Sequence, residues 1–175
     1  MIVKRDCIYT PKGKNRPLHI WLPEDYETSG KRYPVMYFFD GHNLFTDEDA
    51  TYGKSWGLRE FMEGWEKELI IVGVECNHEG NKRLEEYSPV SFEFPEIGQL
   101  PGRGREYMDW MVTALKPYID ANYRTLPDRK NTIIAGSSMG GLMALYGATV
   151  YNHVFQRGAC LSPSLWVAPG KVLEM

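Results

Sequence analysis

The segment Thr132–Leu142 constrains the fold of this chain more than any other. A short apolar run rich in β-branched residues enters the string Gly-Ser-Ser-Met-Gly, and a helix-forming run follows it. The pattern G-x-S-x-G between a strand and a helix predicts a sharp turn that lifts Ser138 above the edge of a sheet. Gly136 and Gly140 lack side chains where the strand and the helix crowd each other. An ordinary glycine-rich turn is the alternative, and the flanking strand and helix favour the first interpretation.

Several further segments have the composition of strands. Residues 2–9 and 17–22 are β-rich and flank a turn, which predicts an antiparallel hairpin. Apolar runs without alternation are typical of strands buried on both faces. Such buried strands are expected at residues 34–39, 69–74 and 131–135. A fourth, short strand is expected at residues 157–161.

Apolar residues at helical spacing predict three helices between these strands. They are expected at residues 58–65, 108–119 and 141–151. Pro117 predicts a kink or break in the second. Residues 26–32 and the charged, proline-containing segment 76–104 are expected to be loops. This alternation predicts a single α/β domain over residues 1–175, with a mostly parallel sheet that begins with an antiparallel hairpin.

Composition excludes several classes of partner. The 175 residues are 43% hydrophobic and carry a net charge of −3, with no basic block, so nucleic acid is not an expected partner. The sequence contains no run of eighteen apolar residues, so no membrane span is predicted. Its first residues do not resemble a secretion signal. Three widely spaced cysteines fit neither a disulfide framework nor a zinc site. We therefore expect a cytoplasmic protein without metal or cofactor.

The chemistry that Ser138 could perform requires further groups. A serine hydroxyl becomes a good nucleophile when a base accepts its proton, and the oxyanion that forms needs N–H donors. The backbone N–H of Met139, at the start of the following helix, is one expected donor. The second is expected from the loop after the 34–39 strand, as the N–H of His42 or Asn43.

The base is harder to find. The usual order is Ser, then Asp or Glu, then His. After Ser138 the sequence contains only His153, which directly follows a predicted helix, and the acidic residue Glu174. His42 is the best internal substitute, although a role as backbone donor alone is the preferred alternative. His19 and His78 are expected to be simple surface or strand histidines.

Other residues could line a substrate pocket beside this turn. Asn43, Ser137, Trp56 and Trp166 lie in or next to segments that should reach the same edge of the sheet. Ordinary packing of the large aromatic side chains is the alternative for the two tryptophans. Arg83 could clamp a polar substrate, although a solvated charged run is the preferred interpretation of its segment.

Four segments together resemble a known family: Tyr33–Phe45, Leu115–Asp120, Thr132–Leu142 and Leu161–Ser164. They are similar to the branch of the α/β-hydrolases that includes esterase D, enterochelin esterases, feruloyl and acetyl-xylan esterases, and mycolyltransferases. The resemblance implies the α/β-hydrolase fold and Ser138 as the nucleophile that accepts the acyl group. It also implies that His42 donates the second oxyanion N–H beside Met139.

Members of that family continue with further strands that deliver the Asp and the His, whereas this sequence stops at Met175. The chain thus resembles the N-terminal two-thirds of the fold, truncated at its C-terminus. A shortened product, a segment supplied by another chain and a protein that no longer catalyses remain open as explanations. The uncovered edge after residues 157–161 predicts a homo-oligomer.

These observations lead to one functional hypothesis and two alternatives. The hypothesis is a serine carboxylester hydrolase that forms an acyl-enzyme on Ser138, with an acylated carbohydrate or a small acyl ester as substrate. An acyltransferase would use the same acyl-enzyme with another acceptor. The last alternative is a catalytically silent α/β-hydrolase remnant that serves as an assembly or binding module.

Overall fold

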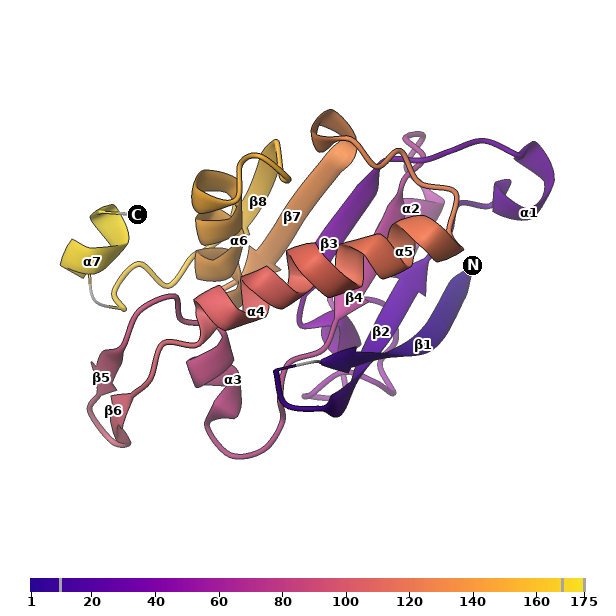
Figure 1. Cartoon of the computed structure of the whole chain (residues 1–175). Helices are drawn as coiled ribbons and strands as arrows, with labels where there is room; N and C mark the ends of the chain where they lie inside the picture. Colours follow the sequence, from indigo (N-terminus) through magenta and orange to yellow (C-terminus); the bar gives the residue numbers. More distant parts are fainter. Residues whose placement is uncertain (10, 168, 175) are drawn as a thin grey trace.

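The computed structural model describes residues 1–9, 11–167 and 169–174, and its centre is a six-stranded sheet (Figure 1). The strand order is β1-β2-β4-β3-β7-β8. The strands are β1 (Ile2–Tyr9), β2 (Lys14–Trp21), β3 (Val35–Phe39), β4 (Ile70–Val74), β7 (Thr132–Ser137) and β8 (Arg157–Leu161). β1, β2 and β4 pair antiparallel, whereas β4, β3, β7 and β8 run parallel. The predicted N-terminal hairpin and parallel sheet are confirmed.

Helices and short turns connect these strands. The α-helices are α1 (Tyr26–Ser29), α2 (Leu58–Glu63), α3 (Lys82–Glu86), α4 (Gly104–Trp110), α5 (Lys116–Asn122), α6 (Met139–Val150) and α7 (Pro169–Leu173). The 3₁₀ turns are η1 (Gly41–Asn43) and η3 (Arg129–Asn131), and η2 (Met111–Leu115) is π-helical. A small separate hairpin consists of β5 (Phe92–Phe94) and β6 (Gly98–Leu100).

Two predicted loops contain regular structure. The segment 26–32 includes α1, which ends where Gly30 adopts a left-handed conformation with φ 65°. The segment 76–104 includes α3 and the β5–β6 hairpin. Sequence patterning missed these elements because each is too short to display a period. The helix expected over 58–65 also ends earlier, at Glu63, with Gly64 at its C-cap.

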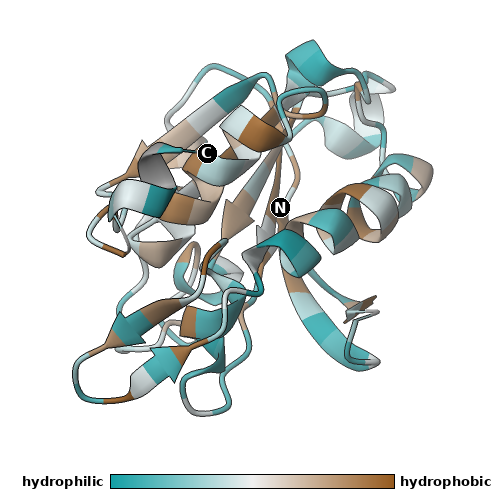
Figure 2. Cartoon of the chain, turned by 60° about the vertical axis from the view of Figure 1, so that its left-hand side comes forward, coloured by the Kyte–Doolittle hydropathy of each residue, from teal (hydrophilic) through white to brown (hydrophobic). Residues whose placement is uncertain are grey.

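The sheet separates two cores. On one face, side chains such as Tyr37, Val72 and Ile134 pack with α4, η2, α5 and α6. On the other face, Phe38 and Ile71 belong to a smaller cluster with residues of α2. Because adjacent residues of a strand point to opposite faces, a strand covered on both sides must be apolar throughout. In Figure 2 the central strands are accordingly brown or pale, while the exposed turns carry teal.

The helix that crosses the front of the sheet in Figure 1 does not break at Pro117. It passes from α4 through η2 into α5, where Pro117 lies in the first turn. A proline ring clashes with the carbonyl four residues earlier in an α-helix, and a wider π turn removes that register. Of the predicted kink or break, the break is therefore absent, and the irregularity near Pro117 is the π-helical segment η2 that ends just before it.

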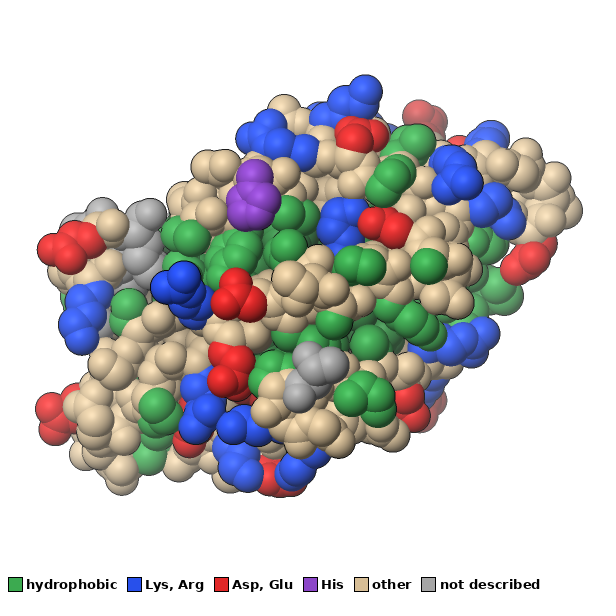
Figure 3. Space-filling model, viewed as in Figure 1, with side chains coloured by type: hydrophobic (Ala, Val, Ile, Leu, Met, Phe, Trp, Pro, Cys, Tyr) green, Lys and Arg blue, Asp and Glu red, His purple; other side chains and the backbone are tan. Residues whose placement is uncertain are grey.

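The surface agrees with the charge pattern of the sequence. Figure 3 shows acidic and basic side chains interspersed on the face that carries α4 and α5, without a large area of one sign. Among the helices that the structure describes, none has both the length and the apolar character that crossing a bilayer requires. The carboxyl ends of β3, β4, β7 and β8 share one edge, which is where the candidate site lies.

Candidate active site

The turn between β7 and α6 has the predicted strained geometry. Ser138 adopts φ 56° and ψ −120°, a conformation that is costly for any residue with a Cβ. A Cβ on Gly136 would overlap the carbonyl of Gly140, which explains why both positions are glycine. Ser138 is exposed to solvent. The strand–turn–helix geometry expected from the sequence is confirmed.

Backbone hydrogen bonds fix this turn to the segment after β8. The N–H of Ser138 donates to the carbonyl of Leu161 at 3.0 Å, and the N–H of Ser164 donates to the carbonyl of Ser138 at 3.0 Å. The hydroxyl of Ser138 lies 3.2 Å from that of Ser164. Ser138 is thus held at a defined position by three hydrogen-bonding groups of the neighbouring chain segment.

The N–H of Met139 is available for a ligand by helix geometry. The first intrahelical bond of α6 runs from the N–H of Leu142 to the carbonyl of Ser138. The N–H groups before Leu142 have no acceptor within the helix, and they lie at the positive end of its dipole. An oxyanion beside Ser138 would meet this group of donors.

The loop after β3 packs against the same turn. A Cβ on Gly140 would lie 3.3 Å from a carboxylate oxygen of Asp40, and one on Gly41 would overlap the backbone of Gly73. In η1 the first bonds come from the N–H groups of Asn43 and Leu44, at 2.9 and 3.3 Å. The N–H of His42 precedes these bonds, so the turn leaves it without an acceptor inside η1.

Asp40 and Arg83 form a buried ion pair behind this loop. Asp40 is 2% exposed and has φ 58°, and its two oxygens accept from Nε and Nη2 of Arg83 at 2.7 Å each. Burial alone would lower the pKa of the Arg83 guanidinium, but hydrogen bonds to Asp40 raise it above its ordinary value. Arg83 is therefore held as a partner of Asp40 and is neither a solvated charge nor a free substrate clamp.

The His42 ring forms no hydrogen bond with Ser138. Its Nε2 lies 3.0 Å from the hydroxyl of Thr51, and its ring centre is 4.6 Å from that of His78. Burial lowers the pKa of His42, so the imidazole is held in its neutral form. Its ring is hydrogen-bonded to Thr51 and not to Ser138, so the structure gives the role of His42 as a substitute base no support, and that role stays a prediction.

The other histidines also lie away from the Ser138 hydroxyl. His153 follows the C-terminal end of α6, and twelve residues of helix span about 18 Å. His19 is buried in β2, not at the surface, and its Nε2 is 2.7 Å from Glu75. His78 is bonded to the same carboxylate at 2.9 Å. No histidine among the described residues is hydrogen-bonded to Ser138.

Sequence reasoning missed a cluster at the ends of β3 and β4. One ligand atom each of His42, Cys76 and His78 lie within 4.8 Å of one another. Burial raises the pKa of the Cys76 thiol to about 12, so the free thiol is protonated. The spacing Cys76-Asn77-His78 was the only local signal, since His42 comes from a different loop.

The four proposed pocket residues occupy two places. Asn43 accepts a hydrogen bond from the N–H of Thr51, and the exposed ring of Trp56 packs 6.0 Å from Phe38. Trp166 is also exposed and packs against the β5–β6 hairpin. Ser137 is half-buried at the end of β7. Their roles in substrate binding stay predictions.

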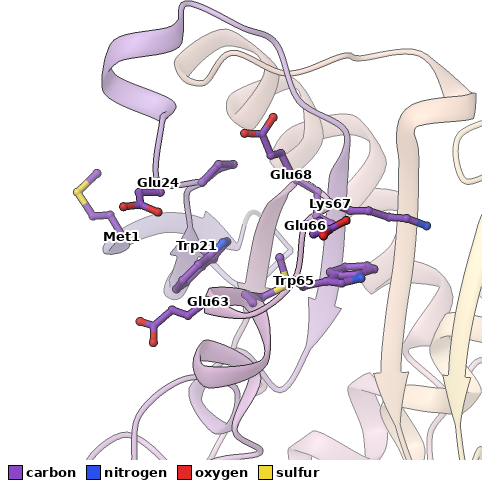
Figure 4. A pocket seen from close by; sticks show the side chains of 11 residues that line it. Met1, Trp21, Glu24, Glu63, Trp65, Glu66, Lys67 and Glu68 are labelled. Atoms are coloured by element: carbon purple, nitrogen blue, oxygen red, sulfur yellow. The ribbon is translucent and has the colours of Figure 1, made fainter.

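A cavity of about 540 Å³ opens elsewhere on the molecule (Figure 4). It is lined by Trp21, Trp65 and several glutamates, including Glu68 just before β4. Since Glu68 precedes the strand, this cavity lies toward the amino ends of the parallel strands. It is therefore separate from the edge that carries Ser138.

The mixed sheet with a strained serine turn after β7 defines the α/β-hydrolase fold. A family model described as "Putative esterase" matches residues 11–172, so the chain belongs to that esterase family. The resemblance found in the sequence is confirmed.

Three relatives illustrate the match. Esterase Rv1288 of Mycobacterium tuberculosis is 38% identical over 144 residues, which cover 81% of this chain and 28% of that protein. The siderophore triacetylfusarinine C esterase of Aspergillus fumigatus is 26% identical over 154 residues, covering 86% and 49%. The crystal structure of the BES protein from Bacillus cereus superposes with a TM-score of 0.74 at 27% identity, covering 99% and 65%. The chain spans 28% to 65% of the length of these relatives.

Proposed function

We propose that this chain carries the nucleophile and the oxyanion-binding amides of a serine carboxylester hydrolase. The Ser138 oxygen attacks the carbonyl carbon of an ester, and the N–H groups of Met139 and His42 hold the negative charge that develops on the carbonyl oxygen. Collapse of the intermediate expels the alcohol and leaves an acyl-enzyme on Ser138. Water then releases the acid and restores the serine.

The observation that carries the proposal is the conformation of Ser138. A residue other than glycine at φ 56° and ψ −120° is kept there only if the surrounding structure enforces it. Here the glycine contacts and the bonds to Leu161 and Ser164 enforce it, and they present the hydroxyl to solvent. Such stored strain at an exposed nucleophile beside free helix N–H groups is typical of a site for acyl transfer.

The mechanism also requires a group that accepts the Ser138 proton. None of the described histidines is bonded to Ser138. We therefore propose that the base comes from residues outside these 175, in the part of the relatives that this sequence does not span or in another chain. The exposed face of Ser138 leaves room for such a group to approach.

The substrate is proposed to be a small-molecule ester, either an acylated carbohydrate or a small acyl ester. One relative is named as the esterase of a siderophore, which supports a small-molecule ester as the substrate. Trp56 and Asn43 on one side and Trp166 on the other are the proposed walls for it. An acyltransferase would share every step up to the acyl-enzyme.

Labelling with a fluorophosphonate probe tests the nucleophile directly. In the assembly or longer chain that also supplies the base, we expect covalent labelling of Ser138, seen by peptide mass spectrometry, and loss of labelling to background in Ser138→Ala. Ser91→Ala, an exposed serine in another loop, is the matched control and should label like the wild type. Labelling spread over several serines, or unchanged in Ser138→Ala, would overturn the proposal. Hydrolysis of p-nitrophenyl acetate by the same variants measures turnover.

One observation favours a second candidate, a catalytically silent module that binds or assembles. The hydroxyl partner of Ser138 is another serine, Ser164, instead of an imidazole. If this candidate is right, wild type and Ser138→Ala release p-nitrophenol at the same slow rate and neither reacts with the probe. Association through the edge of β8 stays a prediction, and light scattering at micromolar concentration tests it.

A further inference from the structure

The cluster at the ends of β3 and β4 has the composition of a transition-metal site. It contains two imidazoles and one thiol, from His42, His78 and Cys76, and their ligand atoms lie within 4.8 Å of one another. Cys76 Sγ is 3.8 Å from Nδ1 of His78. Around a tetrahedral Zn²⁺, with bonds of about 2.0 to 2.3 Å, a nitrogen and a sulfur ligand stand about 3.5 Å apart. The side chains thus need only small shifts to reach coordination distance.

A second observation points independently to a ligand. His42 is only 6% exposed, and its buried Nδ1 has no hydrogen-bond partner among the described residues. An unsatisfied polar atom at such a position costs free energy unless something binds it. Because the other ring nitrogen already contacts Thr51, Nδ1 is the atom left to bind a ligand.

The outer groups are arranged as they are around known metal ligands. A histidine that binds a metal usually has its second nitrogen held by a hydroxyl, carbonyl or carboxylate oxygen. Thr51 meets Nε2 of His42 at 3.0 Å, and a Glu75 oxygen meets Nε2 of His78 at 2.9 Å. In each ring the opposite nitrogen, Nδ1, is thereby left for the cluster.

The charges around the cluster suit a divalent cation. Zn²⁺ bound to one thiolate carries a net charge of +1, and Glu75 lies next to His78 as a compensating carboxylate. Nearby Asp40 is already paired with Arg83, so it does not compete for the metal. His78 has a side-chain exposure of 54%, and this open side gives the ion a route from solvent.

We propose that His42 Nδ1, Cys76 Sγ and His78 Nδ1 form a site for a single Zn²⁺ ion, with a fourth position open toward solvent. On binding, the Cys76 thiol releases its proton to solvent and the sulfur binds as thiolate. The ion joins η1 to the loop after β4. It thereby fixes the loop that contains the backbone N–H of His42. The proposal concerns metal binding and does not depend on ester hydrolysis.

The alternative of a nucleophilic cysteine is disfavoured by the same geometry. Cys76 is 4% exposed, so an organic substrate cannot reach its sulfur. A metal ion needs much less room and can approach from the exposed side of His78. Binding chemistry, not thiol attack, is therefore the use that this arrangement supports.

The test uses the full chain, stripped of metal with a chelator and titrated with Co²⁺ as an optical probe and with Zn²⁺ as competitor. We expect one equivalent to bind and a thiolate-to-cobalt charge-transfer band to appear, which Zn²⁺ abolishes. Cys76→Ala should remove the band, while Cys160→Ala, the matched thiol on β8, should keep it. His78→Ala should weaken Zn²⁺ binding by at least about 100-fold, with His153→Ala as control, and Thr51→Val by about 10-fold.

Several outcomes would overturn the assignment. They are the absence of stoichiometric binding to the wild type, a charge-transfer band that survives Cys76→Ala, and equal weakening by His78→Ala and His153→Ala. Because His78 is exposed, its removal should leave the fold intact, and the melting temperature without metal checks this. Zn²⁺ should raise the melting temperature of the wild type but not that of His78→Ala.

Discussion

Around the ends of β3 and β4, buried titratable groups are joined in pairs, whereas the turn after β7 relies on backbone geometry. The first region, called here the β3–β4 end, contains Asp40 bound to Arg83 and His42 bound to Thr51. The second, the β7 end, presents one exposed hydroxyl whose side-chain partner is Ser164. The difference indicates that one region holds the loops in place and the other holds backbone strain at the proposed nucleophile, Ser138.

The largest loss of stability is expected from substitutions at close contacts between two glycine backbones, a feature that both ends contain. Gly136→Ala places a Cβ on the carbonyl of Gly140, and Gly41→Ala places one on the backbone of Gly73. Backbone cannot move aside cheaply, so each change should lower the free energy of unfolding by about 3 kcal/mol, the upper end of the usual cost of overpacking, in urea denaturation. Gly64→Ala, whose Cβ has its nearest neighbour at 3.8 Å, should change it by less than about 1 kcal/mol. Equal costs at Gly136 and Gly64 would contradict the close contact.

A smaller effect distinguishes the β3–β4 end. Arg83→Met leaves the carboxylate of Asp40 buried without its cation. Breaking a buried pair costs about 3 to 5 kcal/mol, and the partial exposure of Arg83 reduces the expected loss to about 2 to 3 kcal/mol. Lys54→Met removes the partner of Asp47 from an exposed pair and should cost no more than about 1 kcal/mol. If both variants melt alike, the pairing of Asp40 has no structural role.

At the β7 end, glycine should be the stabilising residue, unlike at the glycine positions above, where the comparison starts from glycine and adds a Cβ. Because Ser138 is strained, Ser138→Gly should be more stable than Ser138→Ala by about 1 to 2 kcal/mol, and both variants lack the proposed nucleophile. At Ser164, which has no positive φ, the glycine variant should be the less stable of the pair. Urea denaturation of the four variants measures both differences. An alanine variant at least as stable as the glycine variant at position 138 would show that the turn is relaxed.

The smallest effect is a pH dependence at the β3–β4 end. Burial alone would raise the pKa of Asp49, but hydrogen bonds from Lys4 and Thr46 bring it below its ordinary value. The folded protein thus favours the carboxylate, and this contribution is present above the unfolded pKa of about 4. It is lost as the pH falls through the lower folded value.

Asp49→Asn should therefore be less stable than the wild type at pH 7, by less than about 1 kcal/mol. Thermal melting across the pH range should show the two curves converging below pH of about 4. Glu48→Gln at the exposed neighbouring position controls for the loss of one negative charge. A difference that stays constant into acid would rule out the carboxylate as its source.

Sequence patterning was sufficient for the elements that carry long apolar runs. β3, β4 and β7 are buried on both faces, so their composition alone distinguishes them, and G-x-S-x-G locates the turn at Ser138. The short helices α1 and α3 were missed because a single turn shows no period. At Pro117 a kink or break was predicted, and the π turn that lets the helix continue could not be foreseen because it leaves no mark on apolar spacing.

The β3–β4 end could not be predicted for a different reason. Its pairs join residues far apart in the chain, such as Asp40 with Arg83 and Arg16 with Glu86, the latter at 2.7 Å and buried on both sides. The cluster around Cys76 likewise needs His42 from another loop. One sequence does not show which charged residues face each other, whereas the turn at Ser138, with its flanking strand and helix, is one continuous segment.

The two hydrogen bonds from Ser138 to the segment after β8 have a consequence for assembly. β8 is the outermost strand of the described sheet, and the carbonyl of Leu161, at its end, accepts from the Ser138 N–H. A strand added beside β8 would shift or fix that carbonyl, and with it the orientation of the Ser138 hydroxyl. With Ser138 as the proposed nucleophile, occupation of the sheet margin and the reactivity of the hydroxyl would vary together, so a neighbouring polypeptide could act as an effector without touching the substrate.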